Sequence, residues 1–469
     1  MENASSPSPP AQKPTTLFTL PHALTTSSLK IKHAIMDFAI KAKNTGVDDP
    51  RRIVHSLKVA LAITLVSMIY YLEPLYNGMG DAGMWAVLTV AVVFEYTVGA
   101  TLCKGMNRGL ATLIAGALGI GAESFAGIFG PLVKPFVLGG LVFFLVGAAT
   151  FSRFIPNIKR RYDYGVLIFI LTFSLVSVSG YRVERIIELA HKRLSTILFG
   201  GGICIIISMC VCPVWAGEDL HELIVENMEK LASFLEGFGG VYFRVSEGDR
   251  SSLASYKSVL NSKATEESLA NFAWWEVGHG NFRFRHPWKQ YLKIGAFTRQ
   301  CAYHIEALNG YLDRETEAPS EFQETVKEPC MKMSYEIAEA LKELGSSMKL
   351  MIHPLGSASA IHMENCKKAK EELNTILQAS MVGEHDILET IPVIAVTSIL
   401  VDIINCVETI SEAIEELAKQ ARFKKSKKMT SDKKEKSNFV HDIGALEETA
   451  NGGKNKEYVP VDIASLNKG

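Results

Sequence analysis

The sequence predicts an all-α integral membrane protein, in which a bundle of membrane-spanning helices precedes a helical cytosolic domain. Three observations indicate this fold class. Apolar runs of about 20 residues, the length that crosses a hydrocarbon core, are concentrated between residues 51 and 215. From residue 216 to residue 422 the chain is charged, and its apolar positions recur at helical spacing. Both ends of the chain are polar, so they flank a central ordered region.

The composition excludes several classes of protein. A formal net charge of −1 over 469 residues gives no bulk attraction to nucleic acid. The eight cysteines lack paired spacing with accompanying histidines, so we expect free thiols in a reducing compartment and no structural metal. Phosphate-binding glycine loops and catalytic nucleophile or paired-carboxylate motifs are also missing. We therefore expect neither an enzyme nor a cofactor.

Two segments precede the membrane region. Residues 1–28 are rich in Ser, Thr and Pro, without the apolar stretch of a signal peptide, and are expected to be disordered. Residues 29–50 mix apolar side chains with lysines, which predicts a basic amphipathic helix. Such a helix lies on the inner leaflet or packs against the soluble domain. Asp49 and Pro50 then supply an N-cap and a first-turn proline for the first span.

Six spans are predicted between residues 51 and 215. The fifth is short, and would be extended at its ends or buried inside the bundle. The spans cover residues 53–72, 83–102, 105–129, 132–151, 165–179 and 194–214. Residues 104–109 are expected to form the turn of a hairpin between the second and third spans.

Charged residues lie at or near membrane depth around this hairpin. Glu95 falls within the second span, and Lys104 and Arg108 fall in the turn that follows. Ionisable groups at that depth are costly unless they face a protein interior or a water-filled path, so they indicate a transport pathway. The alternative is that the two cations extend to the membrane interface while their stems stay in lipid.

The distribution of basic residues predicts the orientation. Lysines and arginines cluster before the first span, between the second and third, and between the fourth and fifth. The positive-inside rule places these clusters in the cytosol. The last outer connection is an exception, since it contains Arg182, Arg185 and Lys192 beside acidic residues. With six spans, both termini and the second half of the chain are cytosolic.

The second half, residues 216–422, reads as a helical bundle. A helix begins near residue 217, and others are expected at residues 252–271, 288–312, 320–344, 357–381 and 391–422. Residues 393–404 are apolar enough for a seventh span, but Asp402 and an amphipathic continuation favour a core helix. Residues 423–469 begin with a basic run, continue as a polar tail and are expected to be disordered.

A cluster of aromatic side chains interrupts the bundle. Trp274, Trp275 and Trp288 fall within fifteen residues of one another, with Glu276 beside them. Such a cluster forms a ligand cage or, more commonly, a packed elbow between helices. We expect the packed elbow.

Taken together, these residues resemble the plant aluminium-activated malate transporter family. The resemblance covers residues 46–422 and rests on the motifs GVDDPRR (46–52), MWAV (84–87), VFEY (93–96), GATLCKGMNRG (99–109), YDYG (162–165), RLST (193–196) and CPVWAGEDLH (212–221). It implies an anion channel for malate and inorganic anions, assembled as a homodimer with six spans and a helical cytosolic domain in each subunit. The family's Trp-Glu-Pro motif here reads Trp275-Glu276-Val277, so the elbow loses the fixed φ of proline.

The resemblance also implies functional residues. Arg108 and Arg193 match pore arginines of the family, and an arginine fork suits a carboxylate because it binds bidentately and stays charged. Lys104 and Lys192 would extend the positive potential along the pathway. Glu95 is expected to pair with Arg108 or Lys104 and thereby weaken anion binding. The alternative for Arg193 is an interfacial arginine at a helix start.

The sequence says less about how the protein is regulated and which membrane it occupies than about its fold. Glu184 matches an acidic position of the family that suits aluminium, and Asp81 is the only carboxylate within residues 76–81 of the first outer loop. Aluminium activation is therefore doubtful for this member. The plasma membrane is favoured over the vacuolar membrane, although no targeting signal distinguishes them.

A second function class remains open. A proton-coupled exporter of organic or aromatic acids would need a titrating acid within the membrane, and Glu95 is the candidate for it. A membrane-anchored scaffold, a third class, would leave the embedded charges unexplained.

Overall fold

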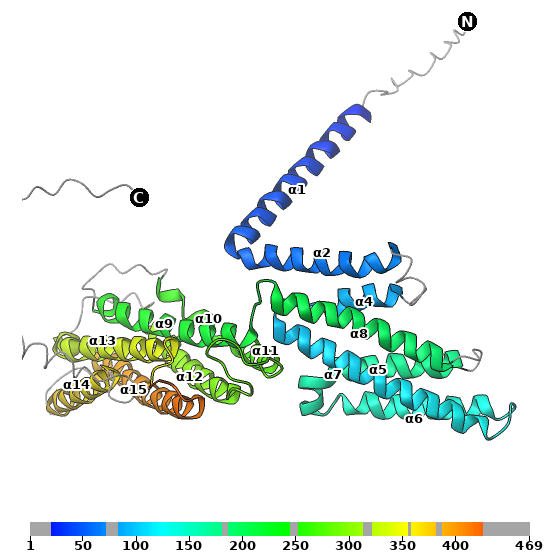
Figure 1. Ribbon diagram of the computed structural model, residues 1–469. Coiled ribbons are helices and arrows are strands. Elements are labelled where there is room, and N and C mark those ends of the chain that lie inside the picture. The colour runs from blue at the N-terminus through cyan, green and yellow to red at the C-terminus, as the bar shows by residue number, and fades with distance from the viewer. Residues whose placement is uncertain are drawn as a thin grey trace, which may run out of the picture.

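The computed structural model describes residues 20–71, 83–180, 186–243, 252–312, 321–354, 358–380 and 387–424. These residues form two groups of helices that lie end to end (Figure 1). The first group comprises α1 (Leu20–Asp48), α2 (Pro50–Tyr71), α4 (Gly83–Val93), α5 (Val98–Gly127), α6 (Lys134–Ser152), α7 (Pro156–Gly180) and α8 (Ile186–Cys210). The second comprises α9 (Ala216–Tyr242), the 3-10 turn η2 (Ser252–Ala254), α10 (Lys257–Leu260), α11 (Lys263–Ala273), α12 (Trp288–Leu312), α13 (Glu321–Lys349), α14 (Ala358–Ser380) and α15 (Ile387–Ala421).

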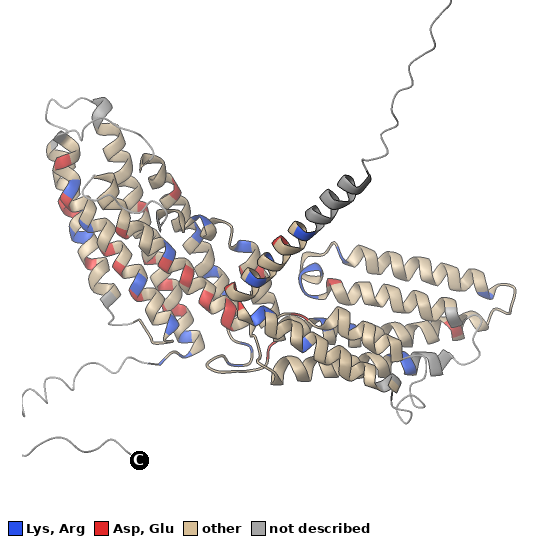
Figure 2. Cartoon of the chain, turned by 90° about the horizontal axis from the view of Figure 1, so that it is seen from above, with Lys and Arg blue, Asp and Glu red and all other residues tan. Residues whose placement is uncertain are grey.

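The two groups differ in charge. Charged side chains are spread over α9–α15 and are sparse on α2–α8 (Figure 2). Five of the described helices are long and apolar enough to cross a membrane, and four of them, α5, α6, α7 and α8, belong to the first group. The fifth is α15. The chain is therefore a multi-pass membrane protein with a large polar helical domain.

The hairpin predicted around residues 104–109 is wrong. The helix breaks earlier, at residues 94–97, and α5 then continues without interruption through Lys104 and Arg108. Thr97 causes the new start, because its side chain accepts a hydrogen bond from the Ala100 N–H as an N-cap. The Val98 N–H donates to the Val214 carbonyl at 2.9 Å, which ties this start to the segment after α8. As a result α4 has only 11 residues and α5 has 30.

Other boundaries also differ from the sequence prediction. The sixth span, predicted to begin at residue 194, is α8, which begins at Ile186, so Arg193 lies within the helix and not at its start. The short fifth span is the end of α7, which begins at Pro156 and runs for 25 residues. The amphipathic helix predicted from residue 29 begins at Leu20 and is α1. In Figure 1, α1 projects away from every other helix. Its side chains Ile35 and Phe38 are 62% and 73% exposed.

Small residues allow the membrane helices to approach closely. A Cβ added at Gly119 of α5 would lie 2.7 Å from a methyl carbon of Val176 on α7. Ala115, Ala122 and Phe173 form a buried cluster along the same contact. Small side chains at such contacts are typical of helix association in membranes, because close backbones gain van der Waals packing.

The second group encloses one continuous apolar core. Leu220, Ile224 and Leu231 place the buried face of α9 at helical spacing, and Ile337 and Leu341 do the same for α13. α15 contributes Val396, Leu400 and Val407 to this core. The expectation that this helix packs inside the soluble bundle therefore agrees with its position, although its length and composition also suit a span.

The single helix predicted at residues 252–271 is three short ones. The 3-10 turn Ser252–Ala254, α10 and α11 follow one another with irregular joints. Tyr256 and Val259 are fully buried against the core in this stretch, so tertiary packing overrides the helical periodicity. Helices α12 and α14 begin and end within one residue of their predicted limits.

Candidate anion pathway and the elbow beside it

The two arginines singled out by the sequence lie on one chamber among the membrane helices. Arg108 is on α5 and Arg193 is on α8, and they are only 6% and 7% exposed. Both line a cavity of about 220 Å³ together with residues of α4 and α7. Its lining is Trp85, Leu88, Val92, Arg108, Tyr164, Leu167, Ile168, Leu171, Thr172, Arg193 and Ile197.

Aromatic side chains hold both guanidinium groups. Arg108 donates from Nη1 to the Tyr164 hydroxyl at 3.2 Å. The Cζ atom of Arg193 lies 4.0 Å from the centroid of the Trp85 ring. A cation over an indole face is attracted by the ring quadrupole without losing its hydrogen-bond donors. The two contacts therefore orient the arginines and leave donors for a ligand.

Neither arginine is neutralised within the part of the chain that the structure describes. The Nε atoms of Arg108 and Arg193 are buried there without a hydrogen-bond acceptor, and no ion pair joins either side chain to a carboxylate. Buried charges are normally paired, because an isolated one loses its hydration. Two unpaired cations at one cavity therefore make a site with a strong preference for an anion.

The other predicted cations lie outside this chamber. Lys104 forms an ion pair with Glu95, and its ammonium also lies 5.7 Å from the Tyr164 ring centroid. Of the two partners considered for Glu95, the structure therefore brings it to Lys104. Lys192 is half-buried beside Arg193 on α8. Glu184 and Asp81 lie outside the described residues.

The elbow between α11 and α12 meets the first turn of two helices. Glu276 is 3% exposed and accepts three backbone N–H groups. Oε1 receives those of Ala216 at 2.6 Å and Gly99 at 3.2 Å, and Oε2 receives that of Gly217 at 3.0 Å. Ala216 and Gly217 begin α9, and Gly99 is the second residue of α5. One carboxylate thus caps a helix of each group.

The capping role is favourable because the first N–H groups of a helix have no intrahelical acceptor and carry partial positive charge. Burial raises the pKa of Glu276, and the N–H donors of Gly217 and Ala216 oppose that rise. In the charged form the side chain satisfies three backbone groups that burial would otherwise leave unpaired.

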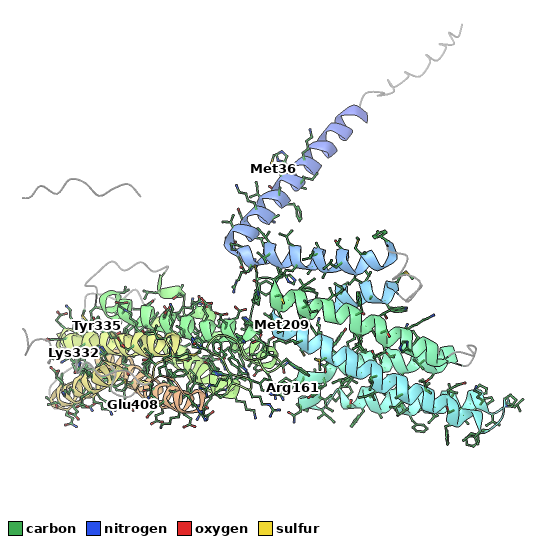
Figure 3. All side chains as sticks on the ribbon, viewed as in Figure 1. Met36, Arg161, Met209, Lys332, Tyr335 and Glu408 are labelled. Atoms are coloured by element: carbon green, nitrogen blue, oxygen red, sulfur yellow. The ribbon has the colours of Figure 1, made fainter. Side chains whose placement is uncertain are left out.

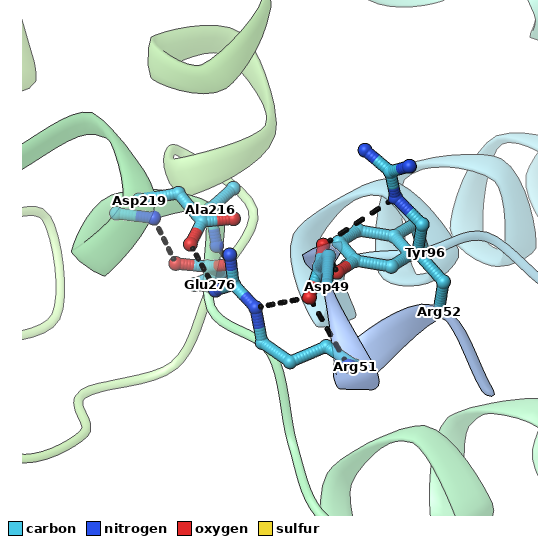
Figure 4. Close-up of polar contacts among 8 residues, drawn as sticks. Asp49, Arg51, Arg52, Tyr96, Ala216, Asp219 and Glu276 are labelled. Atoms are coloured by element: carbon cyan, nitrogen blue, oxygen red, sulfur yellow. Dashed lines mark hydrogen bonds and ion pairs between the residues drawn. The ribbon is translucent and has the colours of Figure 1, made fainter. Parts of the chain in front are cut away.

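A second link lies close to the first, at the junction of α1 and α2 (Figure 4). Arg51 bonds Asp49 through Nε at 3.2 Å and Asp219 of α9 through Nη1 at 3.0 Å. The Tyr96 hydroxyl donates to Asp49 at 3.0 Å. The network thereby joins α2 and the α4–α5 break to the start of α9. Because the Arg51 side chain is 53% exposed, each of these pairs contributes little alone.

The aromatic cluster is a packed elbow. Trp275 meets Tyr162 of α7 edge-on, with ring centroids 6.2 Å apart, and Trp274 lies 4.3 Å beneath the Arg161 guanidinium. Figure 3 shows Arg161 at the junction of the two helical groups. Asn271 donates to the Arg160 carbonyl at 2.8 Å. These contacts attach α11 to the start of α7, as expected for an elbow.

Two neutral histidines lie on the bundle side of the elbow. The Tyr291 hydroxyl is 3.0 Å from Nδ1 of His221 and 3.4 Å from Nε2 of His286. Burial lowers the pKa of His221 to about 4. Burial, and then the positive charge of neighbouring side chains, lowers the pKa of His286 to about 4. Both rings are therefore uncharged at neutral pH.

Sequence reasoning missed several residues that complete these sites. Trp85 and Tyr164 occur in motifs noted for other reasons, yet nothing local assigns them to the arginines. Lys58 of α2 is 2% exposed and donates to the Cys212 carbonyl at 3.2 Å, just beyond the end of α8. A lysine inside an apolar helix is itself a signal, and it could have been singled out.

Comparison with known proteins identifies the family. A family model described as "Aluminium activated malate transporter" matches residues 43–384. The chain is 49% identical over 402 residues to "Aluminum-activated malate transporter 2" of Arabidopsis thaliana, and the aligned region covers 84% of this chain and 80% of that protein. It is 47% identical over 402 residues to "Aluminum-activated malate transporter 1" of Triticum aestivum, covering 82% and 86%. The chain therefore belongs to the aluminium-activated malate transporter family.

Proposed function

We propose that the protein is a passive anion channel that conducts malate and inorganic anions through a pathway lined by Arg108 and Arg193. Because the family is one of transporters, the expectation of a non-enzymatic role is confirmed. The single observation that supports the pathway is the pair of buried arginines without carboxylate partners around one chamber.

The chamber suits a small anion. Its volume of about 220 Å³ is below the range of about 300–1,000 Å³ that is usual for drug-sized ligands. A dicarboxylate would accept hydrogen bonds from both guanidinium groups. The apolar lining would bind few water molecules that could compete with it. Conduction also requires release. The apolar residues and the Trp85 ring offer no further cation to hold the anion.

The remaining features complete the proposal. Lys104 and Lys192 would raise the potential along the path, and the Lys104–Glu95 pair would limit that rise at one point. Helices α2, α5, α6, α7 and α8, together with the 11-residue α4 and the break that follows it, would make six crossings. Both termini would be cytosolic, and two subunits would form a homodimer. We place the protein at the plasma membrane. Aluminium, through Glu184 and Asp81, would not be required for its currents.

Recording from membrane patches tests the pathway. With malate or chloride as the only permeant anion, reversal potentials should follow the anion gradient and be independent of the proton gradient. Arg108→Ala and Arg193→Ala should each reduce the malate current strongly. Arg160→Ala is the matched control, because this guanidinium is exposed outside the chamber. Unchanged currents in both chamber variants, with normal surface expression, would refute the assignment.

The same recordings separate a channel from a proton-coupled exporter. Glu95→Gln removes the only charged partner of Lys104 found among the described residues. A channel should keep conducting after this change, with altered anion affinity. Loss of transport in Glu95→Gln, together with flux that follows the proton gradient in the unmodified protein, would establish the exporter instead.

A further inference from the structure

A groove runs between α14 and α15 on the outside of the cytosolic bundle. It has a volume of about 480 Å³. Pro354 closes one end, α14 supplies one wall and α15 supplies the other. Along the α15 wall are Glu408, Ser411, Glu412 and Glu415, and Glu364 lies across from them on α14. Figure 3 labels Glu408 on this helix.

The groove is acidic and only partly neutralised. Four glutamates line it and Lys367 is the one cation in the lining. Glu364 and Glu415 also pair with Lys368 and Lys419 of their own helices, at 3.9 Å and 3.4 Å, and both of these lysines are exposed. Lys367 pairs with Glu408 at 3.1 Å, but its side chain is 57% exposed, so the pair is easily exchanged. Glu412 is exposed and takes part in no ion pair with another described residue. The surface therefore has negative potential available to a basic ligand.

The chain leaves the bundle at the end of this groove. α15 ends at Ala421, and Arg422 adopts a left-handed conformation with φ of 56°. The Phe423 N–H then bonds the Ala418 carbonyl at 2.9 Å, as in a Schellman cap. Lys424 pairs with the backbone of Met351 at 3.0 Å and of His353 at 2.9 Å. His353 precedes Pro354, so the tail starts beside the closed end of the groove.

The next residues are the most basic run of the chain. Seven lysines occur between residues 424 and 436, with Asp432 and Glu435 as the only acids. We propose that this segment, residues 424–436, docks in the groove between α14 and α15 through its lysines. Ser426, Thr430 and Ser431 lie within the segment, and phosphorylation there would release it, because added negative charge repels the carboxylates.

The dimensions agree with this occupant. From Glu415 to Glu408 the wall extends about 10 Å at 1.5 Å per residue, and five extended residues span about 16 Å. Attachment beside the groove also keeps the lysines at high effective concentration, so weak pairs suffice. The competing partner for a basic segment is anionic lipid of the inner leaflet, which the experiment must separate from the groove.

Limited digestion with trypsin tests the proposal, because docked lysines resist cleavage. The full-length protein is purified in neutral detergent, and cleavage after Lys425, Lys427 and Lys428 is followed by mass spectrometry. The variant Glu408→Gln/Glu412→Gln/Glu415→Gln should be cut at least about threefold faster, since each exposed ion pair shifts the docked population by a factor of about 1.4 to 5. Raising the salt concentration should accelerate cleavage of the unmodified protein similarly.

A matched control removes three exposed glutamates from α9 as Glu222→Gln/Glu226→Gln/Glu229→Gln, and should leave the rate unchanged. If the groove variant does not fold, a second experiment uses the unmodified protein. Zero-length carboxyl–amine cross-linking should then join Glu412 to a lysine of residues 424–436. Equal cleavage rates in the folded groove variant and the unmodified protein, or no such cross-link, would overturn the proposal. The proposal would also be overturned if the lysines resist trypsin only when phosphatidylserine vesicles are present, and to the same extent in the groove variant and the unmodified protein.

Discussion

Replacement of Glu276 gives the sharpest test of how the two groups of helices are held together. The side chain is 3% exposed and caps α9 through Ala216 and Gly217, and α5 through Gly99. Loss of a helix cap costs about 0.5–2 kcal/mol. Two helix starts therefore lose about 1–4 kcal/mol in Glu276→Ala, and burial of the site prevents water from restoring much of it.

The expected shift can be measured. For a bundle of this size, 1 kcal/mol lowers the unfolding midpoint by about 2–4 °C, so Glu276→Ala should lower it by about 2–16 °C. Tryptophan fluorescence during heating in detergent reports the midpoint, with all variants compared at one scan rate because such unfolding is often irreversible. Glu276→Gln should lower the unfolding midpoint by about half as much as Glu276→Ala does. Its carbonyl keeps the two Oε1 bonds, whereas its amide faces the Gly217 N–H.

The matched control is Glu226→Ala on α9, whose side chain is 55% exposed and pairs with Lys230 at 3.0 Å. That change should stay within about 0.5 kcal/mol. If Glu276→Ala melts at the same temperature as Glu226→Ala, the carboxylate does not hold the two helix starts and the reasoning is wrong.

Three further predictions concern the elbow and the helix break. Folding should weaken as pH falls from about 6.5 toward 4, because the unfolded chain protonates His221 and His286 while the folded one, with both pKa values lowered to about 4, does not. Free energies of unfolding from denaturant curves at pH 7.5 and 5 should show a loss of up to about 2 kcal/mol for each ring, and His286→Phe should flatten the dependence on pH; an unchanged dependence contradicts this. Gly99→Ala places a Cβ 2.4 Å from the Phe272 carbonyl oxygen and should lower the melting midpoint. Gly121→Ala should not, because its Cβ would meet no described atom within 4 Å beyond the adjoining backbone of its own helix. Thr97→Ala removes the cap of α5 and should cost about 1 kcal/mol, so a melting curve like that of the unmodified protein would count against the cap.

Sequence reasoning succeeded where the signal was local. The periodicity of α12 predicted Trp288 and Leu312 as its ends, and both are correct. Asp402 and the amphipathic continuation of α15 predicted a core helix, and Leu400 and Val407 of this helix lie in the core of the second group. Family motifs pointed to Arg108 and Arg193, which the structure brings to one cavity.

It failed where distant segments decide the structure. An apolar window from residue 83 to residue 102 gives no sign of the break at 94–97, which depends on Thr97 and on the Val214 carbonyl 116 residues after Val98. The Trp85–Arg193 contact is likewise formed by α4 and α8. Glu276 was noted beside the tryptophans, but its three N–H donors come from two other parts of the chain.

The uninterrupted course of α5 has a consequence for protein engineering. Gly99, held by Glu276, and Arg108 lie nine residues apart on one rigid helix, about 14 Å along its axis. Ala216, held by the same carboxylate, follows the helix that bears Arg193 by only a few residues. A chimaera that exchanges the second group of helices between relatives at residue 215 would therefore separate both arginine helices from their shared anchor. A graft that keeps residues 216–288 with the membrane helices would preserve it.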